Sequence, residues 1–201
     1  MYGWRKMSPQ IRELVLQSRK LNRRPWHNPP HQDRGEGYYH ISAACYEHRP
    51  LIGTNVSRMK TFSEQLLILF QELDCDIASW CVLPNHYHVL LQTKDIKQCL
   101  RNLKNIHGVT AFNWNQEDQM KGRKVWYNYV DRKIRSGRHF WATMNYVHNQ
   151  PVHHGYVKKW GDWPYGSAVD FMKQRSREEL NDLWRRYPIM DYGKGWDDPE
   201  I

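Results

Sequence analysis

The chain has 201 residues, 40% of them hydrophobic, which is enough to build one compact domain with modest extensions. Its 30 Lys and Arg outnumber 21 Asp and Glu, and the formal net charge of +9 favours a polyanionic partner such as nucleic acid. No apolar run approaches the ~18 residues of a membrane span, and no secretory signal opens the chain, so we expect a cytoplasmic protein with no membrane partner.

The cysteine and aromatic content narrows the possible class of protein further. The four cysteines are Cys45, Cys75, Cys81 and Cys99, and without C-x-x-C spacing they indicate buried reduced thiols. The chain also holds 10 Trp and 12 Tyr, and aromatic rings among basic residues favour unpaired bases over duplex. The plain alternative is a basic protein whose charges only face solvent.

The chain begins with a basic segment, residues 1–36, that we expect to be an arm outside the core. A first strand is predicted from Tyr38 to about Cys45, where β-forming residues are frequent. Thr61 and Glu64 have the spacing of a capping box, and this pattern predicts that the first helix begins there.

A β-hairpin is predicted in the middle of the chain. Two strand-like runs, Ile77 to Leu83 and His86 to Gln92, are separated by the turn dipeptide Pro84-Asn85. A second helix follows, because apolar residues recur at helical spacing from Ile96 to His107. Its other face carries a positive stripe of Lys97, Arg101 and Lys104.

The third part of the chain contains a fourth strand and two further helices. The strand is expected from Val125 to Ile134. Ser136 is a candidate N-cap for a helix that runs from Gly137 to about Gln150 and ends at Pro151. A second capping box, Ser176 to Glu179, predicts a last helix in the C-terminal segment.

The order β-α-β-β-α-β followed by an extra helix predicts an α+β, ferredoxin-like fold. We expect an antiparallel sheet with helices on one face, and the extra helix would carry Tyr146. The predicted organisation is a basic arm in residues 1–36, a main domain in residues 37–170 and a helical tail in residues 171–201.

His86 and His88 are the most informative residues. On a strand, residues two apart point to the same face, so both imidazoles could bind one divalent cation. Mg²⁺ or Mn²⁺ is favoured over structural Zn²⁺, since no further imidazole or thiolate lies at zinc-ligand spacing. The alternative is a pair of ordinary hydrogen-bonded strand histidines, although burial in an apolar hairpin would then be costly.

Tyr146 and Gln150 are four residues apart and would share a helix face. A tyrosine hydroxyl attacks a phosphodiester when a cation polarises the phosphate, and Gln150 could supply a third ligand to that cation. The alternative for Tyr146 alone is a half-buried helical tyrosine.

Residues 121–141 combine basic and aromatic side chains and lead into the predicted nucleophile helix, which suggests a path for nucleic acid. With the positive stripe of the second helix, the candidate DNA-binding residues are Lys97, Arg101, Lys104, Arg123, Lys124, Trp126, Tyr127, Arg132, Arg135 and Arg138.

Two segments resemble a known family. Val82-Leu83-Pro84-Asn85-His86-Tyr87-His88-Val89-Leu90-Leu91 resembles the His-hydrophobic-His motif of single-tyrosine HUH transposases, most closely the REP-associated tyrosine transposase branch. Tyr146-Val147-His148-Asn149-Gln150-Pro151-Val152 is similar to that branch's Tyr-Ile-x-x-Asn-Pro-Val. The third-ligand position holds Gln150, the usual residue of the wider family, where the branch usually has Asn.

The resemblance implies metal ligands at His86, His88 and Gln150, and a nucleophile at Tyr146. Such enzymes nick and join single-stranded DNA, often beside a hairpin, through a covalent 5′-phosphotyrosine. The partner would be hairpin DNA and the protein a monomer or homodimer, as a transposase or a domesticated relative. The alternative function is a non-catalytic single-stranded nucleic-acid-binding module on the same fold.

Overall fold

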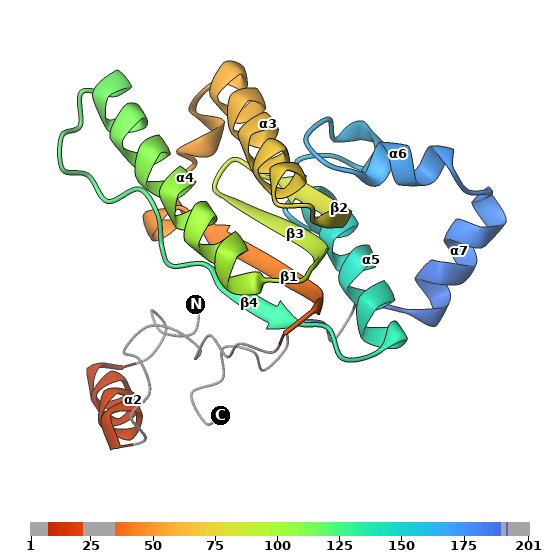
Figure 1. Cartoon of the computed structure of the whole chain (residues 1–201), viewed down its shortest axis with the longest axis horizontal. Coiled ribbons are helices and arrows are strands. Elements are labelled where there is room, and N and C mark those ends of the chain that lie inside the picture. Colours follow the sequence, from red (N-terminus) through yellow and green to blue (C-terminus); the bar gives the residue numbers. More distant parts are fainter. Residues whose placement is uncertain (1–7, 22–34, 190–191, 193–201) are drawn as a thin grey trace. The chain divides into compact units, whose positions relative to one another are not determined.

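The computed structural model describes residues 8–21, 35–189 and 192, and the chain divides into two units. One unit comprises Met1–Gln32 and Met190–Ile201, and its described helix is α2 (Pro9–Leu21). Most of the predicted basic arm lies outside the described residues. The second unit, Asp33–Ile189, contains the other described elements (Figure 1).

A four-stranded antiparallel sheet forms the centre of the second unit, with the strand order β2-β3-β1-β4. The strands are β1 (Gly37–Ala44), β2 (Asp76–Val82), β3 (His86–Thr93) and β4 (Val130–Lys133). The predicted hairpin joins β2 to β3 across Pro84-Asn85. This order and pairing confirm the predicted α+β, ferredoxin-like fold.

Helices cover both faces of the sheet. α3 (Val56–Glu72) and α4 (Ile96–Glu117) pack on one face, where Tyr39, Tyr87 and Val89 help to form the main core (Figure 1). α5 (Gly137–His153) packs on the opposite face, where Met144 meets Leu90. The expectation that helices lie on one face therefore holds for α3 and α4 but not for the extra helix.

α3 begins earlier than predicted. The Asn55 side chain caps the helix by accepting a hydrogen bond from the Arg58 backbone N–H at 2.8 Å. Thr61 and Glu64 lie inside the helix, so the predicted capping box at Thr61 is wrong. Their spacing recurs by chance within a helix that Asn55 has already started, and Met59 is buried in that first part.

Other boundaries also shift. α4 extends beyond His107 to Glu117, and β4 is shorter than predicted because Trp126 makes only an isolated bridge to Cys45. α5 passes through Pro151 and ends at His153. Proline lacks an N–H and so removes one intrahelical hydrogen bond, and the helix ends two residues later.

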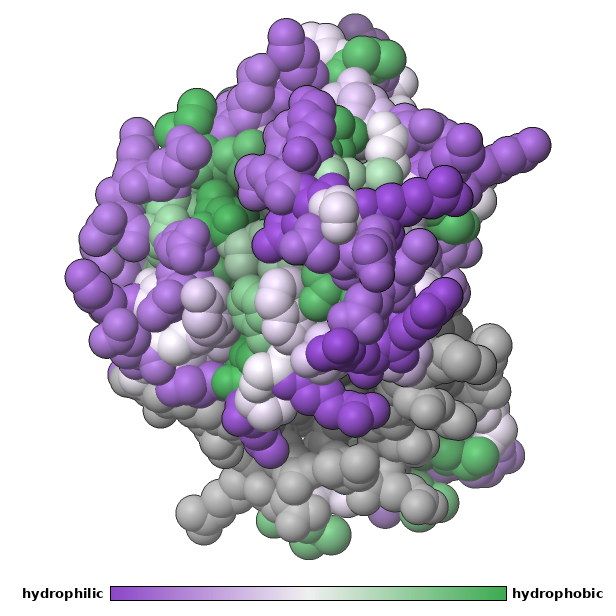
Figure 2. All heavy atoms as spheres, turned by 90° about the vertical axis from the view of Figure 1, so that its right-hand side faces the viewer, coloured by the Kyte–Doolittle hydropathy of each residue, from purple (hydrophilic) through white to green (hydrophobic). Residues whose placement is uncertain are grey.

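The C-terminal helices belong to the same unit as the sheet. They are α6 (Ala168–Lys173) and α7 (Arg177–Arg186), and the predicted capping box at Ser176 and Glu179 is confirmed. Leu183 packs beside the Leu90 cluster, while hydrophilic residues cover most of this side of the molecule, with hydrophobic ones visible between them (Figure 2). Short 3-10 turns occur at Tyr46–His48, Ile52–Thr54 and Trp160–Asp162.

Burial agrees with the sequence-based expectation for the cysteines. All four cysteines are buried free thiols, as predicted. None of the helices in residues 8–21, 35–189 and 192 is both long and apolar enough to span a bilayer.

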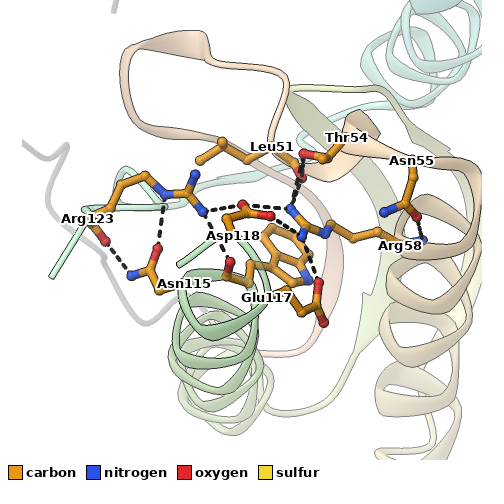
Figure 3. A network of polar contacts seen from close by, with 9 residues as sticks. Leu51, Thr54, Asn55, Arg58, Asn115, Glu117, Asp118 and Arg123 are labelled. Carbon is orange, nitrogen blue, oxygen red and sulfur yellow. Dashed lines mark hydrogen bonds and ion pairs between the residues drawn. The ribbon is translucent and has the colours of Figure 1, made fainter. Parts of the chain in front are cut away.

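An ionic network joins α3 to the end of α4 (Figure 3). The buried Arg58 guanidinium donates to Asp118 and Glu117 at 2.6 Å each. Arg123 donates to the other Asp118 oxygen at 2.6 Å and to Asn115 at 2.9 Å. The hydrogen bond from Arg58 lowers the pKa of Asp118 to about 2, so the network is fully charged near neutral pH.

Replacing Arg58 should destabilise the fold, because Asp118 would lose its main partner in a partly buried position. We expect Arg58→Met to lower the free energy of unfolding by about 3 kcal/mol. Lys60→Met on the same helix is the matched control, because its 3.9 Å pair with Glu64 is exposed, and it should change stability by less than ~0.5 kcal/mol. Urea unfolding measures both, and equal effects would contradict a structural role for the network.

Candidate active site

β3 places His86 and His88 on the sheet face that α5 covers. Their side chains are 8% and 7% exposed, and their rings meet edge to face with centroids 5.1 Å apart. Between them Tyr87 points to the opposite face, into the core under α3 and α4. The predicted alternation of the strand is therefore present, with both imidazoles on one side.

The turn before β3 orients His86. Asn85 donates from Nδ2 to the His48 carbonyl at 3.1 Å, so its Oδ1 is the atom that faces His86 Nδ1, at 2.7 Å. An amide oxygen is only an acceptor, so His86 carries its proton on Nδ1. The lone pair of a neutral His86 is therefore on Nε2.

Backbone geometry holds this turn in place. His48 follows Glu47, and both have left-handed φ angles, 52° and 58°, which are costly for residues other than glycine. Gly53 donates its N–H to the Pro84 carbonyl at 2.9 Å. A Cβ at Gly53 would lie 2.5 Å from the Pro84 Cβ, so the close approach of these two segments requires glycine.

Gln150 completes a group of acceptor atoms. Its Oε1 lies 3.3 Å from His86 Nε2, and its side chain is 2% exposed. With the lone pair of His86 on Nε2, two acceptors face each other, which is unfavourable unless a cation lies between them or the amide is turned over. His88 Nε2 is also buried and has no hydrogen-bond partner among the described residues.

These acceptor atoms can serve as ligands to a divalent cation. Imidazole nitrogens suit first-row transition metals and an amide oxygen suits harder ions such as Mg²⁺, so this mixed set fits a divalent cation such as Mn²⁺. Over residues 8–21, 35–189 and 192, no group of three His, Cys, Asp or Glu side chains is arranged to hold a metal. A metal here would therefore depend on the Gln150 amide as third ligand.

Burial keeps the two histidines neutral. Burial, together with the nearby His154, lowers the pKa of His86 to about 4. Burial and the neighbouring His86 hold the pKa of His88 well below its usual value. At pH 7 both imidazoles can therefore offer a lone pair, which a metal ligand requires.

α5 places Tyr146 beside His88 in the same chain. The two rings meet edge to face with centroids 5.3 Å apart, and Tyr146 is half-buried. Ser136 caps the helix by accepting from the His139 N–H at 3.1 Å, which confirms the predicted N-cap. Gln150 lies one turn after Tyr146, so the helix delivers the phenol and the amide to one region.

The candidate DNA-binding residues fall into separate groups. Lys97, Arg101 and Lys104 are exposed on α4, which covers the sheet face opposite the histidines. Arg132 pairs with His40 across β1 and β4 and so shares the histidine face. Arg135 and Arg138 are exposed at the start of α5.

Two of these candidates are engaged within the protein itself. Trp126 is 8% exposed, stacks on His107 at 4.3 Å, and donates to Thr110 at 3.0 Å. A ring buried in the core cannot stack on a base, so the DNA-binding role predicted for Trp126 is wrong. The Arg123 guanidinium is engaged by Asp118, and its predicted phosphate contact would have to break that pair.

Lys124 and Tyr127 remain at the surface of this segment. Lys124 lies over the Tyr46 ring at 4.7 Å, and the Tyr46 and Tyr127 rings are 5.0 Å apart. Their DNA contact stays a prediction.

Three residues of the site were not predicted from the sequence. Asn85 was interpreted only as part of a turn, yet it sets the tautomer of His86. His40 contacts His88 at 3.1 Å, and the ring of His154 lies 4.9 Å from that of His86. The alternation of side chains along β1 does not by itself say which face of the sheet His40 occupies. The strand order, which places β1 next to β3, shows that this face also carries His88.

Comparison with known proteins agrees with the resemblance. The IS200-like transposase family matches residues 35–150, more than half of the chain. A Haemophilus influenzae protein provisionally named as a REP-associated tyrosine transposase is 29% identical over 100 residues, 43% of this chain and 55% of that protein. The chain thus matches about half the length of this curated relative.

Two solved structures are similar. A REP-associated tyrosine transposase bound to a REP hairpin is 16% identical, with a TM-score of 0.58, and the match covers 83% of this chain and 94% of that one. A Deinococcus radiodurans protein provisionally named as a transposase is 14% identical, with a TM-score of 0.40, and the match covers 61% of this chain and 97% of that one. The first supports the fold, and the family match includes His86, His88, Tyr146 and Gln150. The chain therefore belongs to the IS200-like transposase family.

Proposed function

We propose that this protein nicks and joins single-stranded DNA in a metal-dependent reaction that passes through a 5′-phosphotyrosine at Tyr146. The observation that carries this proposal is the position of the Tyr146 ring, 5.3 Å from that of His88 within one chain. A phenol beside two neutral imidazoles and a buried amide has the groups needed to attack a phosphodiester.

His86, His88 and Gln150 would hold the cation, which we propose to be Mg²⁺ or Mn²⁺. When bound, the cation polarises a phosphate oxygen and reduces the charge that the attacking oxygen meets. The rigid placement of Tyr146 on α5 then supplies orientation, because the helix is held by its cap at Ser136 and by packing on the sheet.

The reaction exchanges one phosphodiester for another. The Tyr146 oxygen loses its proton and bonds to phosphorus, and the bond from phosphorus to the 3′ oxygen breaks. The leaving oxygen takes up a proton to become a free 3′-hydroxyl, while the 5′-phosphate stays on Tyr146. Attack by a 3′-hydroxyl on this link would reverse the step and join strands.

The proposed substrate is hairpin-containing single-stranded DNA, handled by a transposase or a domesticated relative. The net charge of +9 supports a polyanionic substrate, and the similar structure of the REP-associated transposase was solved with a REP hairpin. Because one chain brings Tyr146 and the histidines together, we propose that the tyrosine acts on its own subunit's site.

Tyr146→Phe tests the nucleophile. With hairpin DNA and Mn²⁺, the unmodified protein should form a protein–DNA adduct that resists denaturation, and Tyr146→Phe should form none, because it lacks the attacking oxygen. Tyr156→Phe is the matched control, since Tyr156 is an exposed tyrosine just beyond α5, and it should form the adduct normally. Denaturing gel electrophoresis measures all three.

The same experiment separates the enzyme from the alternative of a non-catalytic binding module. A binding module would retain the hairpin in EDTA and form no adduct under any condition. An adduct that persists in Tyr146→Phe would contradict the assignment of the nucleophile.

Asn85→Ala tests the metal site through the tautomer of His86. Without the Asn85 acceptor, His86 can place its proton on Nε2, and the Mn²⁺ dissociation constant should rise by roughly 10- to 100-fold. Asn128→Ala, at an exposed loop position, should leave it unchanged. Isothermal titration of the metal-free proteins gives these constants, and equal affinity for Asn85→Ala and the unmodified protein would contradict the role of Asn85.

A further inference from the structure

His40 is a buried polar residue next to the site, and neither sequence motif includes it. It lies on β1, where it pairs with Leu90 of β3 and Arg132 of β4. Its side chain is 4% exposed, and its ring stacks on that of His88 with centroids 5.2 Å apart and planes 27° apart. The Tyr146 ring lies edge-on to it at 5.9 Å.

The contact between the two imidazoles is a nitrogen-to-nitrogen hydrogen bond. His40 Nε2 lies 3.1 Å from His88 Nδ1, so one of these atoms carries the shared proton and the other accepts it. Both rings are buried, and in a pair of neutral imidazoles each ring holds one proton, so the position of the first proton determines the position of the second.

The two possible arrangements differ at His88 Nε2. If His88 donates from Nδ1 to His40, its Nε2 carries a lone pair. If His40 donates instead, His88 must carry its proton on Nε2, where an N–H would exclude a cation. His88 Nε2 is buried and makes no hydrogen bond in the described part of the chain, so a lone pair at this atom is left for a ligand.

We propose that His40 is a positioning residue that accepts the Nδ1 proton of His88 and so directs the His88 Nε2 lone pair toward the metal. This inference rests on the proposed function, because it assumes that His88 is a ligand. His40 would act on His88 as Asn85 acts on His86, with a different chemical group on a different strand. Fixing a ligand's tautomer through its other nitrogen is a general way to raise metal affinity.

Two substitutions of His40 separate acceptance of the proton from packing. His40→Phe keeps an aromatic ring against His88 but removes the acceptor, and its Mn²⁺ dissociation constant should rise by roughly 10- to 100-fold. His40→Gln can place its amide oxygen near the former Nε2, so affinity should stay within about threefold of the unmodified protein. Titration calorimetry on the metal-free proteins provides the constants.

His107→Phe is the matched control. His107 is also buried and hydrogen-bonded, to the Tyr87 hydroxyl at 3.0 Å, but it lies on the other face of the sheet. The His107→Phe protein should unfold at a lower temperature than the unmodified protein, but its Mn²⁺ affinity should be unchanged. Equal Mn²⁺ affinity for His40→Phe and the unmodified protein, or an equal loss in His40→Phe and His40→Gln, would overturn the inference.

A measurement on the unmodified protein keeps the test valid if His40→Phe does not fold. Long-range proton–nitrogen NMR of the metal-free protein should show the His88 proton on Nδ1, and a proton on Nε2 would overturn the inference. The proposed function fails separately: if His86→Ala binds Mn²⁺ as well as the unmodified protein does, the site itself is wrong, whatever His40 does.

Discussion

The burial of β3 on both faces is the constraint on which the site depends. Tyr87, Val89 and Leu91 fill the core under α3 and α4, so the alternating residues His86 and His88 must face α5. Imidazoles cannot be buried there without hydrogen-bond partners. Asn85 and His40 contact the Nδ1 atoms of His86 and His88, and the Gln150 Oε1 lies 3.3 Å from His86 Nε2, so the Nε2 atoms are left for another ligand.

The elements around the sheet keep this arrangement rigid. α5 is held on the side away from the site by the Asn145 amide, which donates to the carbonyls of Leu183 and Tyr187 at 3.3 and 2.9 Å. On the other face of the sheet, the network of Arg58, Asp118 and Arg123 joins the end of α4 to α3. Catalytic geometry of this kind needs such support, because small displacements of a nucleophile are costly in rate.

Sequence patterns predicted much of the fold and part of the site. The strand alternation and the turn at Pro84-Asn85 were enough to place His86 and His88 together, and helical spacing was enough to pair Tyr146 with Gln150. Helix boundaries were predicted wrongly where two capping patterns lay close together. The chance capping box at Thr61 follows the true N-cap at Asn55.

Contacts between distant segments were beyond such patterns. His40 is 48 residues from His88, and only the β2-β3-β1-β4 order brings their strands side by side. The local sequence around Trp126 is the same whether its ring belongs to an exposed aromatic strip or to the core, so the sequence could not distinguish the two. Trp126 is buried against His107 because α4 packs on the sheet, and this packing cannot be deduced from composition.

We propose that three acceptor atoms, His86 Nε2, His88 Nε2 and Gln150 Oε1, bind one cation beside Tyr146. Crystals soaked in Mn²⁺ and measured near the manganese absorption edge test it most directly. We expect one strong anomalous peak at about 2.0–2.3 Å from each of the three atoms. A peak bound elsewhere, with His88 Nε2 left without a ligand, would contradict it.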